Sequence, residues 1–154
     1  MDIKRILAPT DFSECARPAL DYAIFLARRL GARVDVLNVW ELPINVVPDW
    51  LVQVPGEPAQ PVSALVRGGA ALQLELLINE LRVSFENVHG RLERGDPTET
   101  IARVAAHDKF DLIVMGTHGR TGLAHMWSGS VAEKVLRRAP CPVMSVRSPD
   151  RKQS

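Results

Sequence analysis

Short apolar runs alternate with longer amphipathic stretches along most of the chain, and this order constrains the fold more than any other feature. The apolar runs predict five buried strands, although Gly90 interrupts the third, at 3–8, 34–39, 88–93, 112–115 and 143–146. Four stretches between them have helical spacing. Strands that alternate with helices predict a parallel sheet covered on both faces, which is a doubly wound, three-layer α/β sandwich.

Each helical stretch carries apolar residues at spacings of three and four, which predicts one buried face. The first helix is expected to stop at Gly31, and the third to start at Asp96-Pro97, where Glu99 can complete a capping box. The predicted buried positions, in chain order, are Leu20, Ala23, Ile24, Ala27, Leu30; Leu74, Leu77, Ile78, Leu81, Phe85; Ile101, Val104, Ala105; and Ala132, Val135, Leu136, Ala139.

The segment 41–61 interrupts the alternation. Five of its residues are prolines, at positions 43, 48, 55, 58 and 61, which excludes a regular helix or a central strand there. At 154 residues the chain fits one domain, so we interpret 41–61 as an excursion of a domain at 1–147, followed by a polar tail at 148–154. Trp50 in this excursion either covers a pocket or partner, or packs on the domain's own core.

The charges are balanced, with 19 Lys and Arg against 18 Asp and Glu, which gives no case for broad binding to nucleic acid or an anionic membrane. The sequence opens M-D-I-K-R-I-L-A-P without a long apolar signal region, and no stretch is apolar for long enough to span a bilayer. The default expectation is a cytoplasmic protein. Cys15 and Cys141 lack metal-ligand spacing and are expected to be small buried hydrophobes.

A glycine segment follows the fourth apolar run, and Asp111 to Ser130 reads D-L-I-V-M-G-T-H-G-R-T-G-L-A-H-M-W-S-G-S. The inferred order is strand, glycine loop, helix, in which backbone N–H groups and the helix N-terminus can hold an anion. Gly116, Gly119 and Gly129 would permit close backbone approach, and Ser130 would add a hydroxyl donor. The alternative is that these glycines only form a turn.

In a doubly wound sheet, ligands bind beyond the carboxyl ends of the strands where the winding reverses. A reversal between the first and fourth strands would bring Ala8-Pro9-Thr10-Asp11 next to the segment from Gly116 to Gly129. Asp11 could then accept hydrogen bonds from a ribose or a base edge. It could equally be a plain helix cap.

The same residues resemble the ATP-binding branch of the universal stress protein family. The resemblance rests on the spacing G-x2-G-x9-G-S from Gly116 to Ser130, on I-L-A-P-T-D-F-S near the start, on V-L-N-V, and on G-S-V-A-E-K-V-L-R-R-A-P-C-P-V near the end. Trp127 and Ser128 depart from it, because smaller aliphatic residues are expected before Gly129.

The resemblance implies a five-stranded sheet of order 3-2-1-4-5 that binds ATP, with Mg²⁺ or Mn²⁺ on the phosphates and no dedicated metal cage. It also implies a homodimer through the last strand, at Val143, Met144 and Val146. The adenosine end would be lined by Pro9, Thr10, Asp11 and Val39, and the ribose and phosphates would be surrounded by Met115, Gly116, His118, Gly119, Gly129, Ser130 and Val131. Arg120 could reach a terminal phosphate or be simply solvated, and His125 is assigned no ligand contact.

The leading hypothesis is therefore a nucleotide-binding regulatory protein of the stress response, with no catalytic residues. A slow ATP-hydrolysing enzyme is a second reading, but the chain lacks G-x-x-x-x-G-K-[ST] and an evident base and nucleophile. A phosphoacceptor domain ranks last, because the sequence has Thr10-Asp11 and Arg147 where clustered acids and a lysine are needed. A nucleotide-free dimeric interaction module is the remaining alternative.

Overall fold

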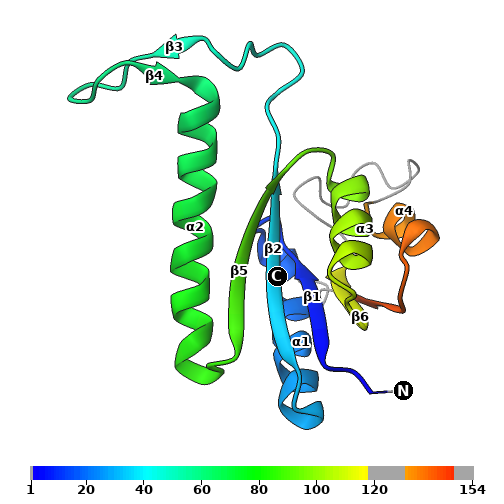
Figure 1. Cartoon of the computed structure of the whole chain (residues 1–154). Helices are drawn as coiled ribbons and strands as arrows, with labels where there is room; N and C mark the ends of the chain where they lie inside the picture. Colours follow the sequence, from blue (N-terminus) through cyan, green and yellow to red (C-terminus); the bar gives the residue numbers. More distant parts are fainter. Residues whose placement is uncertain (1, 118–130, 148–154) are drawn as a thin grey trace, which may run out of the picture.

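A computed structural model describes residues 2–117 and 131–147 of the chain. Its main sheet has five parallel strands in the order β5-β2-β1-β6-β7, and β3 and β4 form a separate antiparallel pair (Figure 1). The strands are β1 (Arg5–Pro9), β2 (Arg33–Trp40), β3 (Leu51–Val52), β4 (Gln60–Pro61), β5 (Val88–Arg94), β6 (Leu112–Gly116) and β7 (Val143–Val146). The helices are η1 (Glu14–Ala16), α1 (Arg17–Leu30), α2 (Val62–Ser84), α3 (Pro97–His107) and α4 (Val131–Arg138).

The main sheet confirms the predicted doubly wound α/β sandwich. Counting only its five strands along the chain, the order is 3-2-1-4-5. Successive side chains of a strand point to opposite faces, so Ile6 and Ala8 lie in one core cluster with α1 and α2, while Leu7 lies in a second cluster with α3 and α4. Two helical layers therefore enclose the sheet, as Figure 1 shows.

The predicted helix faces are correct at most positions. Leu20, Ile24, Ile78 and Val104 are among the buried positions that the spacing identified. Two predicted positions are wrong, because Leu30 is 41% exposed and Leu136 is 60% exposed. Both lie in the last turn of their helices, and at 100° per residue each points to the margin of the buried face rather than to its centre.

The start of α3 follows the predicted capping pattern. The Asp96 carboxylate accepts a hydrogen bond of 2.9 Å from the backbone N–H of Glu99, and Pro97 occupies the first helical position. The Glu99 carboxylate, which was expected to complete the capping box, lies 3.5 Å from the Arg138 guanidinium of α4. Glu99 thus links the two helices of one layer.

Gly90, which interrupts the apolar pattern of β5, has a packing explanation. A Cβ atom at this position would lie 3.0 Å from Cγ1 of Ile78 and 3.2 Å from Cγ of Leu74, both on α2. These contacts are tighter than ordinary van der Waals separation. The absence of a side chain at Gly90 therefore allows the second half of α2 to approach the edge strand β5 this closely.

The excursion 41–61 is more regular than the proline content predicted. Leu51 pairs with Pro61 and Val52 with Gln60, which makes β3 and β4 a short hairpin. Figure 1 shows this hairpin standing clear of the main sheet, at the end of α2 that extends past the sheet. No central strand or helix forms within 41–61, as expected.

An ion-pair network ties β5 to α3 and to the residue that follows it. Arg91 contacts both Glu93 and Asp108, and Arg103 contacts Glu93 at 3.1 Å. Burial opposes ionisation of Glu93, but Arg91 and Arg103 outweigh it and lower its pKa. The pKa of Asp108 is lowered by hydrogen bonds from His107 and then Arg91. The folded chain therefore stabilises the ionised form of both carboxylates.

Acidification is expected to weaken this network. Carboxyl groups with lowered pKa values stabilise the fold above their unfolded pKa values, about 3.9 for Asp and 4.3 for Glu, and that contribution is lost as the pH falls through the folded values. Below about pH 4, the urea midpoint of the wild type should fall more steeply than that of Arg91→Gln, measured by circular dichroism. Parallel profiles for the two proteins would contradict this account.

Candidate functional site

The winding of the sheet reverses between β1 and β6. The two strands are parallel neighbours, with Ile6 opposite Leu112 and Leu7 opposite Ile113. The chain leaves β1 for α1 on one face of the sheet, and it leaves β6 toward α4 on the other face. The carboxyl ends of β1 and β6 therefore lie at the topological switch point of the sheet, which is where ligands bind in doubly wound proteins.

The loop after β1 is held by hydrogen bonds at each of its first residues. Thr10 is 7% exposed; its N–H donates to the carbonyl of Leu37 at 2.8 Å, and its own carbonyl accepts from the Asn38 side chain at 2.9 Å. The N–H of Phe12 donates to Oγ1 of Thr10 at 3.1 Å, and Phe12 has a φ of 63°. These contacts fix a sharp turn directly beyond the strand.

Asp11 lies at the centre of this turn. Its Oδ1 accepts hydrogen bonds from the backbone N–H of Ser13 at 3.0 Å and from the Ser13 hydroxyl at 2.6 Å. The two hydrogen bonds hold the carboxylate in one orientation, and the residue is half-buried. Asp11 therefore holds the turn before η1 and is not the helix cap that the sequence offered as one reading, because the N-cap positions of η1 and α1 are Ser13 and Ala16. The other reading, contact with a ribose or a base edge, stays a prediction.

Asn38 is a structural contributor that the sequence analysis missed. Its side chain is 6% exposed in the middle of an apolar strand, and its amide holds the carbonyl of Thr10. A buried polar side chain usually has a hydrogen-bonding task. The single Asn within the apolar stretch V-L-N-V is the sequence signal for this role.

The loop after β6 begins at the same edge. Met115 is 5% exposed, Gly116 is half-buried, and the N–H of Thr117 donates to the carbonyl of Val146 at 3.0 Å. Val131, 41% exposed, begins α4, whose next residue Ala132 belongs to the same core cluster as Met115. Several residues named from the sequence lie outside the described part of the chain. They are the predicted site residues His118, Gly119, Arg120, Gly129 and Ser130, together with His125, Trp127, Ser128 and the tail 148–154.

Val39 supplies the apolar part of the edge. Leu37 pairs with Pro9 across β1 and β2, so Val39 lies two positions further toward the carboxyl end, level with the turn after β1. It is partly buried and packs against the cluster that contains Leu37 and Met115. The structure thus brings Pro9, Thr10, Asp11, Val39, Met115 and Gly116 to one edge of the sheet, with Val131 at the start of the neighbouring helix.

A metal centre would need clustered ligand side chains, and a redox centre would need reactive or paired cysteines. They contain no group of three or more His, Cys, Asp or Glu side chains placed to hold a metal ion. Cys15 and Cys141 are both free, and burial, followed by the charge of Asp111, raises the pKa of the Cys141 thiol. Neither feature indicates a metal or redox centre in this part of the chain.

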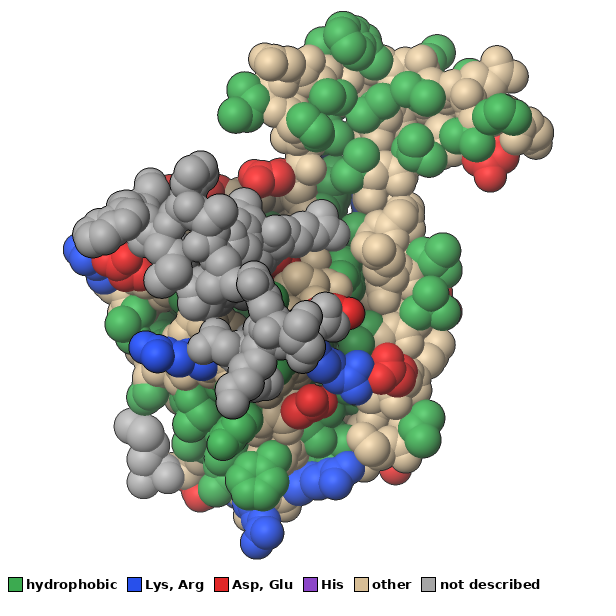
Figure 2. All heavy atoms as spheres, turned by 180° about the vertical axis from the view of Figure 1, so that it is seen from behind, with side chains coloured by type: hydrophobic (Ala, Val, Ile, Leu, Met, Phe, Trp, Pro, Cys, Tyr) green, Lys and Arg blue, Asp and Glu red, His purple; other side chains and the backbone are tan. Residues whose placement is uncertain are grey.

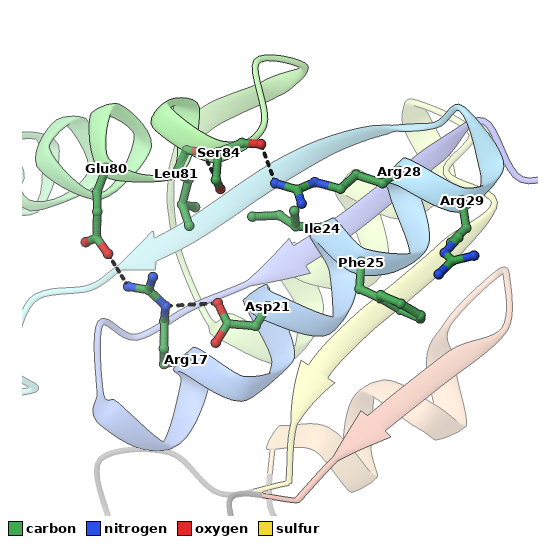
Figure 3. A pocket seen from close by; sticks show the side chains of 9 residues that line it. All are labelled: Arg17, Asp21, Ile24, Phe25, Arg28, Arg29, Glu80, Leu81 and Ser84. Carbon is green, nitrogen blue, oxygen red and sulfur yellow. Dashed lines mark hydrogen bonds and ion pairs between the residues drawn. The ribbon is translucent and has the colours of Figure 1, made fainter.

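One hollow formed by described residues lies elsewhere, between α1 and α2. It has a volume of about 500 Å³ and contains none of the predicted site residues (Figure 3). Within residues 2–117 and 131–147, no helix combines the length and the apolar character needed to cross a lipid bilayer.

Together these features define a doubly wound α/β protein with a candidate ligand site at the topological switch point. The chain belongs to the universal stress protein family, whose sequence profile matches residues 2–147. It is 35% identical over 147 residues to universal stress protein MJ0531 of Methanocaldococcus jannaschii, covering 95% of this chain and 83% of that protein.

Solved structures have the same fold. A universal stress protein in complex with cAMP aligns with a TM-score of 0.73 at 19% identity, covering 97% of this chain and 100% of the other. A universal stress protein from Archaeoglobus fulgidus in complex with dAMP aligns with a TM-score of 0.65 at 22% identity, covering 96% and 100%. Proteins with this fold therefore include some that bind adenine nucleotides.

Proposed function

We propose that this protein binds ATP at the carboxyl ends of β1 and β6 and acts as a regulatory protein of the universal stress response in the cytoplasm. The observation that carries the proposal is the topological switch point between β1 and β6, where a hydrogen-bonded turn at Thr10 and Asp11 follows one strand and Gly116 ends the other. The adenine nucleotides bound by two structural relatives support the choice of ligand class.

The described residues suit the adenosine end of such a ligand. Val39 presents an apolar surface on which a base can lie, and the Asp11 carboxylate can accept from a ribose hydroxyl. Pro9, Thr10, Met115 and Val131 would shape the cavity around them. Gly116, His118, Gly119, Arg120, Gly129 and Ser130 would surround the phosphates, according to the spacing of the signature.

A divalent ion would enter with the nucleotide. The described residues offer no acidic or histidine cluster for it. Mg²⁺ commonly binds through substrate phosphates while it keeps several water ligands. We therefore propose that Mg²⁺ or Mn²⁺, if bound, is held mainly by the phosphates, and we assign no protein side chain to it.

Asp11 gives a test of the adenosine end. Asp11→Ala should weaken ATP binding by roughly tenfold or more, because a hydrogen bond to a charged group contributes about 1.5–3 kcal/mol. Ser13→Ala, which removes only the hydroxyl that donates to Asp11, should leave the affinity within about twofold of the wild type, since the backbone N–H bond remains. Equal losses in both variants, measured by calorimetry, would assign Asp11 to the turn alone.

We also propose a homodimer through β7. This strand ends the main sheet, and a strand at the edge presents unpaired backbone groups to one side. Val143, Met144 and Val146 are only partly buried although they pack against the two core clusters. Sedimentation velocity at micromolar concentration should give a species larger than one chain, and a monomer would refute this proposal.

The function itself is tested by the ligand that the protein carries. Protein purified without added nucleotide is denatured, and the released small molecules are identified by mass spectrometry. We expect an adenine nucleotide among the released molecules. Its mass would distinguish ATP from ADP and AMP. If the released fraction holds none and the native protein binds none when it is added, the proposal is wrong.

A further inference from the structure

The outer face of α2 carries a second apolar stripe that the fold does not use. The buried residues of α2 are Leu74, Ile78 and Leu81, all in its second half. On the opposite side, four large apolar side chains face solvent: Leu65 at 38%, Leu72 at 57%, Leu76 at 61% and Val83 at 90% exposure. The helix packs on its own domain through one apolar face, so the second apolar face is free to contact another molecule.

The spacing of the exposed stripe is that of a coiled-coil seam. Leu65 and Leu72 are seven residues apart, as are Leu76 and Val83, and Leu72 and Leu76 are four apart. With Gly69 and Asn79, both exposed, they fill every a and d position of a heptad pattern. The stripe extends for about 27 Å at 1.5 Å per residue. A seam of this kind fits another helix with the same repeat.

The seam is also complementary to itself when reversed. If two copies of α2 run antiparallel, Leu65 lies opposite Val83, Gly69 opposite Asn79, and Leu72 opposite Leu76. Each layer then pairs an a position with a d position, which gives the same contacts in both directions, as a two-fold interface requires. Gly69, where a Cβ would meet nothing within 4 Å, leaves room for the Asn79 amide of the other copy.

The hairpin of β3 and β4 excludes the parallel arrangement. It is fixed to the start of α2, because the N–H of Val62 donates to the carbonyl of Trp50 at 2.8 Å and the N–H of Ser63 to that of Pro48 at 3.2 Å. Figures 1 and 2 show the hairpin overhanging α2 on the side away from the sheet. Two parallel helices would bring both hairpins into the same space, whereas antiparallel helices place them at opposite ends.

The antiparallel arrangement also brings complementary surfaces together. Segment 41–61 has three acids, Glu41, Asp49 and Glu57, and no Lys, Arg or His. Its apolar side chains are exposed, including Ile44 at 102% and Trp50 at 58%, and Figure 2 shows hydrophobic side chains gathered on this projection. In the antiparallel pair it would lie near the far end of the other copy's α2.

That end of α2 borders the hollow between α1 and α2. The hollow is lined by three arginines, Arg17, Arg28 and Arg29, and by two acids, Asp21 and Glu80 (Figure 3). Its apolar lining residues include Ile24, Phe25 and Leu81. Arg17 joins the two helices through Glu80 at 2.7 Å. In the antiparallel pair, an acidic, apolar projection would therefore meet a surface that is apolar and has an excess of arginine.

We propose that a second copy of this chain docks on the outer face of α2, so that the two α2 helices pair antiparallel through Leu65, Leu72, Leu76 and Val83. Each β3–β4 hairpin then lies against the far end of the other copy's α2. This surface is distinct from β7, and use of both would assemble more than two chains. The helix is already held by its own domain, so pairing carries no cost of helix formation.

Charge placed in the seam should separate the copies. Leu72→Glu/Leu76→Glu puts four carboxylates in each interface, and we expect association through α2 to weaken roughly 100-fold or more. Leu136→Glu is the matched control, because Leu136 is 60% exposed on α4, away from α2. In sedimentation velocity the double variant should have a lower mass than both the wild type and the control. An unchanged mass would overturn the proposal.

Disulfide trapping tests the direction of the helices. In a Cys15→Ser/Cys141→Ala background, we would prepare Leu65→Cys and Val83→Cys separately and oxidise each alone and after mixing. The antiparallel register predicts cross-linked dimers in the mixture, while each alone should match Lys134→Cys, an exposed control on α4. Cross-linking of each protein alone as strongly as in the mixture, or none in the mixture above the control, would overturn the arrangement.

Discussion

Replacing Gly129 with valine should reduce the affinity for ATP by roughly 100-fold, or about 2.8 kcal/mol. In the signature from Gly116 to Ser130, Gly129 immediately precedes the serine and the start of α4. A phosphate held at a helix N-terminus needs close access to backbone N–H groups. A branched side chain at Gly129 would occupy that space, and calorimetric titration with ATP measures the loss.

Gly68→Val provides the control for this substitution. Gly68 is exposed on α2, and a Cβ there meets nothing within 4 Å, so the same change of residue leaves the β1 and β6 edge untouched. We expect its ATP affinity to equal that of the wild type. If Gly129→Val also binds ATP as the wild type does, the phosphates lie elsewhere, even if the protein remains an ATP-binding protein.

Leu37→Ala is expected to lower the free energy of unfolding by about 3 kcal/mol, near the middle of the range for buried leucines. Leu37 is 0% exposed at the centre of β2, in the cluster covered by α3 and α4. Its removal would leave a cavity under both helices. Urea titration followed by circular dichroism measures the stability.

The control is Leu136→Ala, which shortens a leucine that is 60% exposed. Its stability should stay within about 0.5 kcal/mol of the wild type, as is usual for surface positions. A loss at Leu37 no larger than at Leu136 would contradict the core assignment. It would mean that the cluster beneath α3 and α4 contributes little to the stability of this domain.

Much of this fold could be predicted from the sequence, because its strands and helices are long enough for their periodicity to be read. The alternation of patterns identified all five strands of the main sheet, and Asp96-Pro97 located the start of α3. Gly90 weakened the prediction of β5, since its role depends on Leu74 and Ile78 in another element. No local pattern reports such a contact.

Other features were outside the reach of pattern reading for different reasons. The strands β3 and β4 have two residues each, too few to show alternation, and prolines suggested irregular structure. The outer stripe of α2 was overlooked because the face with Leu74, Ile78 and Leu81 already explained the helix. Only the three-dimensional arrangement shows that Leu65, Leu72 and Val83 remain uncovered.

The candidate site also has a part that the sequence predicts and a part that it does not. Asp11 and Gly116 lie far apart in the sequence, and the general rule for doubly wound sheets was sufficient to predict that they share an edge. The rule does not predict how the turn is held. Asn38 secures the carbonyl of Thr10 from the neighbouring strand, and this contact depends on the register between β1 and β2.

Calorimetric titration of the nucleotide-free wild-type protein with ATP tests the central claim most directly. The account predicts saturable binding of one nucleotide per chain, with an affinity that is lower in Asp11→Ala and roughly 100-fold lower in Gly129→Val. The absence of saturable heat with ATP in the wild type, together with no adenine nucleotide carried by the purified protein, would contradict it.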